Sequence, residues 1–229
     1  NKNLDYKIIG TIGWGSFYII SREDFMDIKD LKGKEIYTIG KGLTPDVMLQ
    51  TILKENNINL AKDLKINYLS GSNELAPMYL AGKIKIAMVS EPVLSKIMSK
   101  DNKSKINFNM DNEWKKAFGI NLGFPQSTLI ASENLIKEDP EFIAKFITEL
   151  GNSIEFIYGK SLNKEKYITE SKVTIDTSIL DEVIKRANIN FVSAEDSKEA
   201  YKLYFEKIEK TNKKAIGGKI PDEKIFMSK

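Results

Sequence analysis

This sequence holds 229 residues, 41% of them hydrophobic, which is enough for one large domain or two small ones with a substantial core. Its 35 basic and 32 acidic residues nearly cancel without a dense Lys/Arg run, so nucleic acid is not expected as a partner. Cys and His are both absent, which excludes disulfides, thiol chemistry, structural zinc sites and Ser-His-Asp triads within these residues. Most acid–base enzymes would also lose their commonest proton carrier.

The first apolar segment covers residues 8–20 and is rich in β-formers, but three glycines interrupt it. The pattern predicts two short strands or one broken strand, with Trp14 and Tyr18 near the break. Residues 21–33 are charged, and we expect a connection with a short helical turn there. No stretch of the chain approaches the length of an apolar membrane span.

A strand, a glycine-flanked turn and a helix follow at residues 35–57. Gly40 and Gly42 permit backbone angles that are closed to other residues. Thr44 suits the N-cap of the helix, and Pro45 suits its first position. Such a turn can present free backbone N–H groups to a ligand at the carboxyl end of a strand. The alternative is an ordinary strand-to-helix connection.

Further strands and helices alternate after this turn, which predicts a parallel sheet with helices on its faces. After a strand at 128–131 the chain becomes mostly helical, and its apolar stripes are typical of core-facing surfaces rather than of a cofactor site. The expected elements are strands at 64–69 and 84–89, helices at 74–81 and 93–98, a polar loop at 99–112, and a long helix opened by Pro140.

Three ordered segments resemble ABC-transporter solute-binding proteins of the nitrate/sulfonate/taurine/thiamine-precursor group. They are residues 30–36 (DLKGKEI), 40–46 (GKGLTPD) and 81–92 (AGKIKIAMVSEP). Residues 125–131 (PQSTLIA) resemble that family's return into its first lobe, and residues 216–222 (IGGKIPD) resemble its C-terminal tail. The resemblance therefore spans essentially the whole chain.

The resemblance implies an α/β, type II periplasmic-binding-protein-like fold with two lobes whose parallel-type sheets are flanked by helices. Residues 34–125 are expected to form the second lobe, and residues 1–33 and 126–229 a partial first lobe. The chain is expected to cross between lobes near residues 21–33 and 119–127.

Two departures from the family pattern stand out. Lys85 occupies a position where the family often has an acidic residue, and we expect this change to affect surface charge. Family members also begin with several first-lobe strands and helices that have no counterpart here. We therefore expect a fragment or a divergent short member. Its uncovered first lobe predicts dimerisation, strand exchange or a covering partner.

The implied function is that of a non-enzymatic, extracytoplasmic solute-binding component of an ABC importer, in the periplasm or as a lipoprotein at the cell surface. Its partners would be a membrane permease and a small solute, either a sulfonate, a pyrimidine-like molecule or another small anion or heterocycle. No cofactor or metal is expected, although a metal bound only by carboxylates stays open. The alternatives are an enzyme like those of thiamine-pyrimidine synthesis, or a ligand-sensing module on the same fold.

In a two-lobed binder, the ligand lies between the lobes and touches the turns that follow the second-lobe strands. Backbone N–H groups would bind an anionic group, and a carboxylate would pair with an amine or cation. The expected ligand-binding residues are Trp14, Ser16, Gly42, Leu43, Thr44, Ser72, Asn73, Glu91, Gln126 and Ser127.

Several of these residues have structural alternatives. Thr44, Ser72 and Asn73 could each cap a helix instead of binding a ligand. Trp14 could be a core residue rather than a stacking platform. Glu91 could cap the next helix or face solvent.

Overall fold

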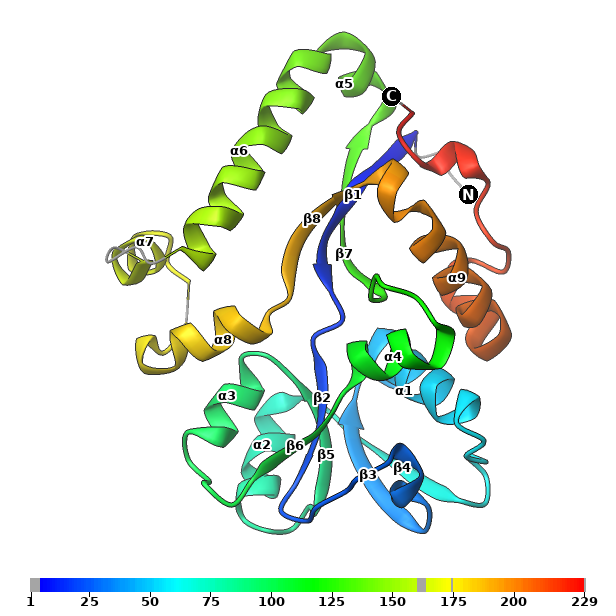
Figure 1. The fold of residues 1–229 in the computed structure, drawn as a ribbon, viewed down its shortest axis with the longest axis vertical. Helices are drawn as coiled ribbons and strands as arrows, with labels where there is room; N and C mark the ends of the chain where they lie inside the picture. The colour runs from blue at the N-terminus through cyan, green and yellow to red at the C-terminus, as the bar shows by residue number, and fades with distance from the viewer. Residues whose placement is uncertain (1–4, 160–163, 174, 229) are drawn as a thin grey trace.

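The computed structural model describes residues 5–159, 164–173 and 175–228. Its described strands form a three-stranded sheet in the order β7-β1-β8 and a five-stranded sheet in the order β4-β3-β5-β2-β6. Figure 1 shows the first sheet in the upper half of the molecule and the second in the lower half. We call the corresponding parts the three-stranded unit (residues 5–15 and 125–228) and the five-stranded unit (residues 16–118).

Helices accompany both sheets, which makes this an α/β protein with two units. The three-stranded unit contains β1 (Tyr6–Trp14), β7 (Pro125–Ser132), α5 (Glu133–Glu138), α6 (Pro140–Tyr158), α7 (Lys164–Glu170), α8 (Leu180–Arg186), β8 (Ile189–Ser193) and α9 (Ala194–Asn212). The five-stranded unit contains β2 (Phe17–Ser21), β3 (Lys34–Ile39), α1 (Thr44–Glu55), β4 (Leu64–Leu69), α2 (Ser72–Leu80), β5 (Ile86–Ser90), α3 (Val93–Met98), β6 (Lys105–Asn109) and α4 (Met110–Phe118).

The strand directions differ from the expected parallel-type sheets. In the three-stranded sheet, β1 is antiparallel to both β7 and β8. In the five-stranded sheet, β3 is parallel to β4 and β5, whereas β2 is antiparallel to β5 and β6. The β1–β7 pair is antiparallel because the chain leaves the three-stranded unit through β1 and returns through β7. The neighbouring strands at the crossover therefore run in opposite directions.

The first crossover lies earlier in the chain than the sequence pattern predicted. Strand β2 belongs to the five-stranded sheet, so residues 17–33 are part of the five-stranded unit. The expectation had placed them in the other unit, with the first lobe. The chain passes between units at Gly15 and Ser16, directly between β1 and β2. It returns through residues 119–124, between α4 and β7. The apolar residues of 8–20 thus form two strands, the first of the two expected alternatives, and each strand joins a different sheet.

The region predicted as a polar loop at 99–112 was also assigned wrongly. It contains β6 and the first turn of α4. Strand β6 pairs with β2 at the edge of the sheet, and its sequence Lys-Ile-Asn-Phe-Asn alternates polar and apolar residues. An edge strand tolerates that polarity because one of its faces meets solvent.

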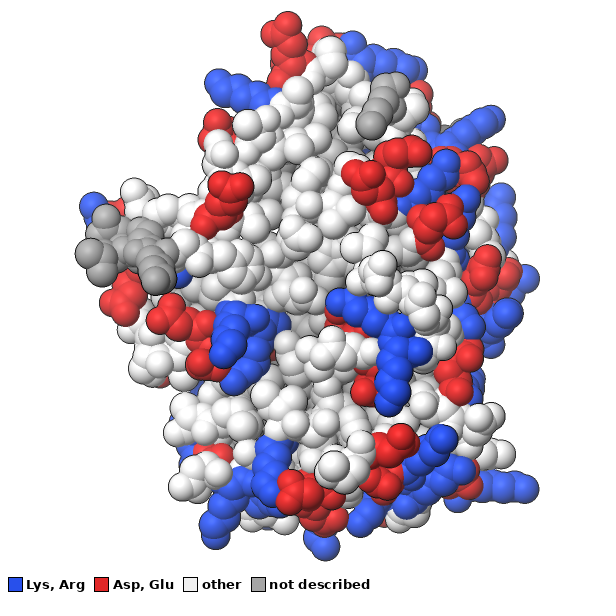
Figure 2. Space-filling view, in the orientation of Figure 1, with Lys and Arg blue, Asp and Glu red and all other residues white. Residues whose placement is uncertain are grey.

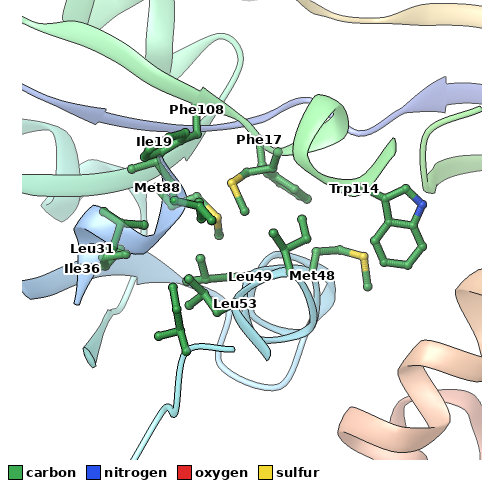
Figure 3. Packing of buried hydrophobic residues seen from close by; sticks show 14 of the residues in the cluster. Phe17, Ile19, Leu31, Ile36, Met48, Leu49, Leu53, Met88, Phe108 and Trp114 are labelled. Atoms are coloured by element: carbon green, nitrogen blue, oxygen red, sulfur yellow. The ribbon is translucent and has the colours of Figure 1, made fainter. Parts of the chain in front are cut away.

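The five-stranded sheet is covered on both faces. Along β2, Phe17 and Ile19 pack into one cluster, while Tyr18 and Ile20 pack into the other, as alternation along a strand requires. Figure 3 shows the first cluster, in which Phe17 and Ile19 lie near the side chains of α1. Burial on both faces explains why every residue of β2 is buried.

The three-stranded unit is less well covered. Helix α6 has 19 residues, but Ile143 is the one buried residue along it. Phe142, Phe146 and Phe156 remain 50%, 45% and 39% exposed. In Figure 2 the surface over this helix and the adjacent strands is largely free of charged side chains, which gather elsewhere on this face. Within the described residues, no helix is both long and apolar enough to cross a membrane.

The two crossovers meet at the buried carboxylate of Asp111 on α4. Gly15 N–H donates to the carbonyl of Phe124 at 3.2 Å, which ties the outward crossover to the returning one. A Cβ on Gly123 would lie 1.7 Å from Asp111 Oδ1, so this position needs a glycine for close approach. Lys115 Nζ lies 2.7 Å from Asp111 Oδ2. Burial raises the pKa of Asp111, and the nearby Lys115 opposes that shift.

Candidate functional site

A cavity of about 280 Å³ lies between the two units. We call it the interunit cavity. Its walls come from both ends of the first crossover, from the loop after β5, from the start of β7 and from α8. Its lining residues are Ile12, Gly13, Trp14, Ser16, Glu91, Pro92, Gln126, Ser127, Val183, Ala187 and Ile189.

Half of the expected ligand-binding residues line this one cavity. They are spread over more than 100 positions of the chain and come together because both crossovers pass here. They are Trp14, Ser16, Glu91, Gln126 and Ser127.

Ser16 and Gln126 are joined across the two crossovers. Gln126 Oε1 accepts hydrogen bonds from the backbone N–H of Ser16 at 2.8 Å and from its hydroxyl at 3.2 Å. The amide oxygen of Gln126 is therefore committed to Ser16. The group that Gln126 can offer to a molecule in the cavity is its NH₂ donor.

Glu91 follows β5 and is the carboxyl-bearing residue that lines the interunit cavity. Its side chain is only 4% exposed, so the alternative that it faces solvent is wrong. Its carboxylate accepts hydrogen bonds from the Ser95 hydroxyl at 2.9 Å and from the Ser95 backbone N–H at 3.2 Å. Glu91 thus holds the first turn of α3 and also lines the cavity. Burial raises the pKa of Glu91, while Ser95 and Arg186 act in the opposite direction.

Trp14 combines the two roles that the sequence left open. It is 3% exposed, like a core residue, and it also lines the interunit cavity. Its indole N–H donates to the carbonyl of Asn190 at 2.9 Å. This bond satisfies the polar atom of the side chain, so the surface that Trp14 contributes to the cavity is apolar.

The glycine-flanked turn does not offer the free amides that were expected of it. Gly42 N–H donates to Asp46 Oδ2 at 2.7 Å, and Leu43 N–H donates to the carbonyl of Gly40 at 2.9 Å. The acidic residue in the first turn of α1 therefore takes the place of an anionic ligand. Thr44 does not cap α1, because the N-cap is Leu43. These three positions are not among the residues that line the interunit cavity.

Ser72 and Asn73 lie in the first turn of α2. The N-cap of this helix is Gly71, which makes no side-chain cap, so the capping alternative is wrong for both residues. Ser72 lines a small cavity of about 50 Å³ at the carboxyl edge of the five-stranded sheet. Asn73 is exposed and does not line either cavity.

The sequence reasoning missed the contribution of α8. Val183 and Ala187 form one wall of the interunit cavity, and Arg186 lies behind Glu91. One available signal was composition, since Arg186 is one of two arginines in a chain whose other basic residues are lysines. Arginine is the residue that best binds a carboxylate and a second acceptor together. Among the described residues, no group of three or more His, Cys, Asp or Glu could hold a metal ion.

Several solved structures that are similar to this chain are described as ABC-transporter or sulfonate-binding proteins. A protein described as an ABC transporter from Parabacteroides distasonis is 23% identical, with a TM-score of 0.83 over 100% of this chain and 76% of that one. The periplasmic aliphatic sulphonate binding protein SsuA from Escherichia coli is 13% identical, with a TM-score of 0.66 over 96% of this chain and 70% of that one. The alkanesulfonate-binding protein SsuA from Xanthomonas axonopodis pv. citri, bound to MOPS, is 16% identical, with a TM-score of 0.56 over 90% and 70%.

These likenesses establish the fold, which is that of the type II periplasmic binding proteins. No curated protein matches the chain in sequence. A family model described as NMT1/THI5 like matches residues 12–161, well over half of the chain. The match covers the first crossover, the whole five-stranded unit, the return crossover and all of α6. The chain therefore belongs to the NMT1/THI5-like family.

Proposed function

We propose that this protein is the solute-binding component of an ABC importer and that it holds a small organic molecule in the interunit cavity. The observation that carries this proposal is the cavity itself, which both units build from polar and apolar residues. The fold and the printed descriptions of the similar structures support it. The protein would act without catalysis outside the cytoplasm, in the periplasm or on a lipid anchor, and would deliver its solute to a membrane permease.

The cavity residues favour one class of solute among those expected. Glu91 places a buried carboxylate in the wall, whereas Trp14, Pro92 and Ile189 provide apolar surface. A sulfonate beside this carboxylate would bring two like charges together away from water, which is costly. A flat heterocycle with N–H groups would donate to Glu91 and pack its ring on the apolar wall. A pyrimidine-like solute is therefore favoured over an anion.

The size of the cavity agrees with a small solute. Ligand pockets for drug-sized molecules span roughly 300–1,000 Å³, and the interunit cavity holds about 280 Å³. A single ring with short substituents would fill it. The enzyme alternative has less support because Glu91 is the one carboxyl-bearing residue lining the cavity and the chain has no His or Cys.

The test is isothermal titration with 4-aminopyrimidine and with methanesulfonate, together with native mass spectrometry of any molecule that copurifies. We expect the aminopyrimidine to bind and Glu91→Gln to weaken it at least tenfold, since a hydrogen bond to a charged group is worth about 1.5–3 kcal/mol. Asp181→Asn is the matched control, because Asp181 is an exposed acid in the first turn of α8. Failure of every compound in a broad panel to bind would contradict the proposal.

A further inference from the structure

Helix α8 belongs to the three-stranded unit but closes one side of the interunit cavity. Val183 and Ala187 line the cavity from this helix and its C-cap. The opposite wall, at Glu91 and Pro92, belongs to the five-stranded unit. The width of the cavity therefore depends on where the end of α8 is held. Asn188, just beyond the helix, donates to Asp111 Oδ2 at 3.3 Å, and Arg186, the last residue of α8, makes the other contacts that hold it there.

The main chain of Arg186 makes the first of these contacts. Tyr18 Oη donates a hydrogen bond to the carbonyl oxygen of Arg186 at 2.9 Å. Carbonyl groups in the last turn of a helix lack partners within the helix, and this one finds its partner on β2 of the other unit. Tyr18 is 5% exposed, so its hydroxyl is fixed by the surrounding core. Burial, together with the charge of Glu91, raises the pKa of Tyr18 to about 12, which keeps its donor proton in place.

The side chain of Arg186 makes the second set of contacts. Its Nη1 donates to the Ser95 hydroxyl at 3.2 Å and lies 3.6 Å from Glu91 Oε1. Its Nη2 lies 2.6 Å from Glu182 Oε2 on the same helix. The guanidinium thus joins the exposed side of α8 to the loop after β5 and the start of α3. We call Tyr18, Glu91, Ser95 and Arg186 the Arg186 clasp.

The carboxylate inside the clasp needs its cationic partner. The side chain of Glu91 is 4% exposed and that of Arg186 is 22% exposed. Removing one member of such a partly desolvated pair leaves the other charge poorly compensated, which costs more than the pair itself contributes. Glu91 lines the cavity, whereas Arg186 does not.

We propose that Arg186 is a positioning residue for the interunit cavity. Through the clasp it sets the wall of α8 and the carboxylate of Glu91 in place together, so the shape of the site and its main polar acceptor depend on one side chain that does not touch the solute. The role of Arg186 toward a solute rests on the proposed function. Its role in holding the two units at a fixed separation is independent of that function.

The test measures the separation between the units without any ligand. The chain has no native Cys, so spin labels at Lys54→Cys on α1 and Lys185→Cys on α8 report one distance by pulsed electron resonance. Both lysines are exposed. We expect a narrow distribution for the otherwise unchanged protein, loss of that narrow peak for Arg186→Met, and partial recovery for Arg186→Lys. The lysine keeps the charge but lacks the planar donor fork.

Two further variants separate this role from a general loss of structure. Asp181→Asn changes an exposed acid of α8 that is not part of the clasp, and it should keep the narrow peak. Glu91→Gln should broaden it, and adding Arg186→Met to Glu91→Gln should broaden it little further, because both changes break the same contact. A circular dichroism spectrum checks that each variant is folded.

An unchanged distribution in folded Arg186→Met would overturn the proposal, as would strictly additive effects of the two substitutions. If the spin-label distance distributions change as expected and no solute binds, Arg186 holds the two units together but the proposed function is wrong. If 4-aminopyrimidine binds equally well with and without Arg186, the positioning role is wrong while the solute-binding function stands.

Discussion

The two units of this protein are stabilised in different ways. In the five-stranded unit, two large groups of buried side chains cover both faces of the sheet. In the three-stranded unit, two small clusters each centre on three buried residues. The upper sheet also depends on polar contacts: Tyr201 Oη shares hydrogen bonds with Thr11 on β1 and Thr128 on β7 at 2.9 and 2.7 Å. We infer that the five-stranded unit contributes most of the free energy of folding. The three-stranded unit then depends largely on its contacts with the five-stranded unit.

The largest expected effect contrasts a core residue of the lower unit with an aromatic residue of α6. Leu49 is fully buried beside the sheet, as Figure 3 shows, whereas Phe146 is 45% exposed. Leu49→Ala should lower the free energy of unfolding by about 2–5 kcal/mol, because it leaves a cavity in a packed core. Phe146→Ala should cost less than about 1 kcal/mol. Urea unfolding of both variants measures the difference, and equal losses would contradict the unequal division of stability.

The junction between the units should show an intermediate effect. A methyl group at Gly123 would collide with the Asp111 carboxylate, and both groups are buried. We expect Gly123→Ala to lower the free energy of unfolding by about 1–3 kcal/mol, the usual cost of overpacking. Gly151→Ala is the matched control, because nothing lies within 4 Å of a Cβ at that position in α6. That control should be neutral or stabilising by about 0.5–1 kcal/mol.

The smallest effect concerns pH and Glu91. Burial raises the pKa of this carboxyl above its ordinary value of 4.5, so the folded protein holds the proton more tightly than the unfolded chain does. Stability contributed at this site should therefore fall as the pH rises from 4.5 through the folded-state pKa, and then stay constant. Glu91→Gln lacks this titration, so its melting temperature relative to the unchanged protein should rise over that pH range. If the melting temperature of Glu91→Gln falls relative to the unchanged protein over this pH range, then Arg186 lowers the pKa of Glu91 more than burial raises it.

The elements of the lower unit were largely predictable from local sequence. The strand at 64–69, the helix that begins with Thr44 and Pro45, and the strand that ends at Ser90 all carry local signals of propensity, capping or glycine punctuation. The change of sheet between β1 and β2 was not predictable in the same way. Residues 8–20 look alike on both sides of the break, and only long-range pairing decides which sheet each part joins.

The candidate site shows the same limit. Glu91 and Gln126 follow or begin strands, so their positions could be expected from the order of elements. The hydrogen bond of the Gly42 N–H could not be expected in this way, because its acceptor is the side chain of Asp46 in the first turn of the helix. Arg186 also escaped notice, because its partners on β2 and α3 are 168 and 91 positions away. Such contacts come from tertiary geometry and leave no local pattern.

The short link between β1 and β2 limits how the two units can move. Only Gly15 and Ser16 separate the two strands, and an extended chain spans at most about 3.3–3.6 Å per residue. The return segment is fastened beside this link by the hydrogen bond between Gly15 and Phe124. The units therefore cannot slide apart at this point, and admitting a solute requires rotation about it. The end of α8 lies close to this pivot, because Asn188, two residues beyond Arg186, donates to the carbonyl of Gly15 at 3.4 Å and accepts from the N–H of Trp14 at 3.1 Å. Such a rotation would therefore move the start of α8 farther than its end.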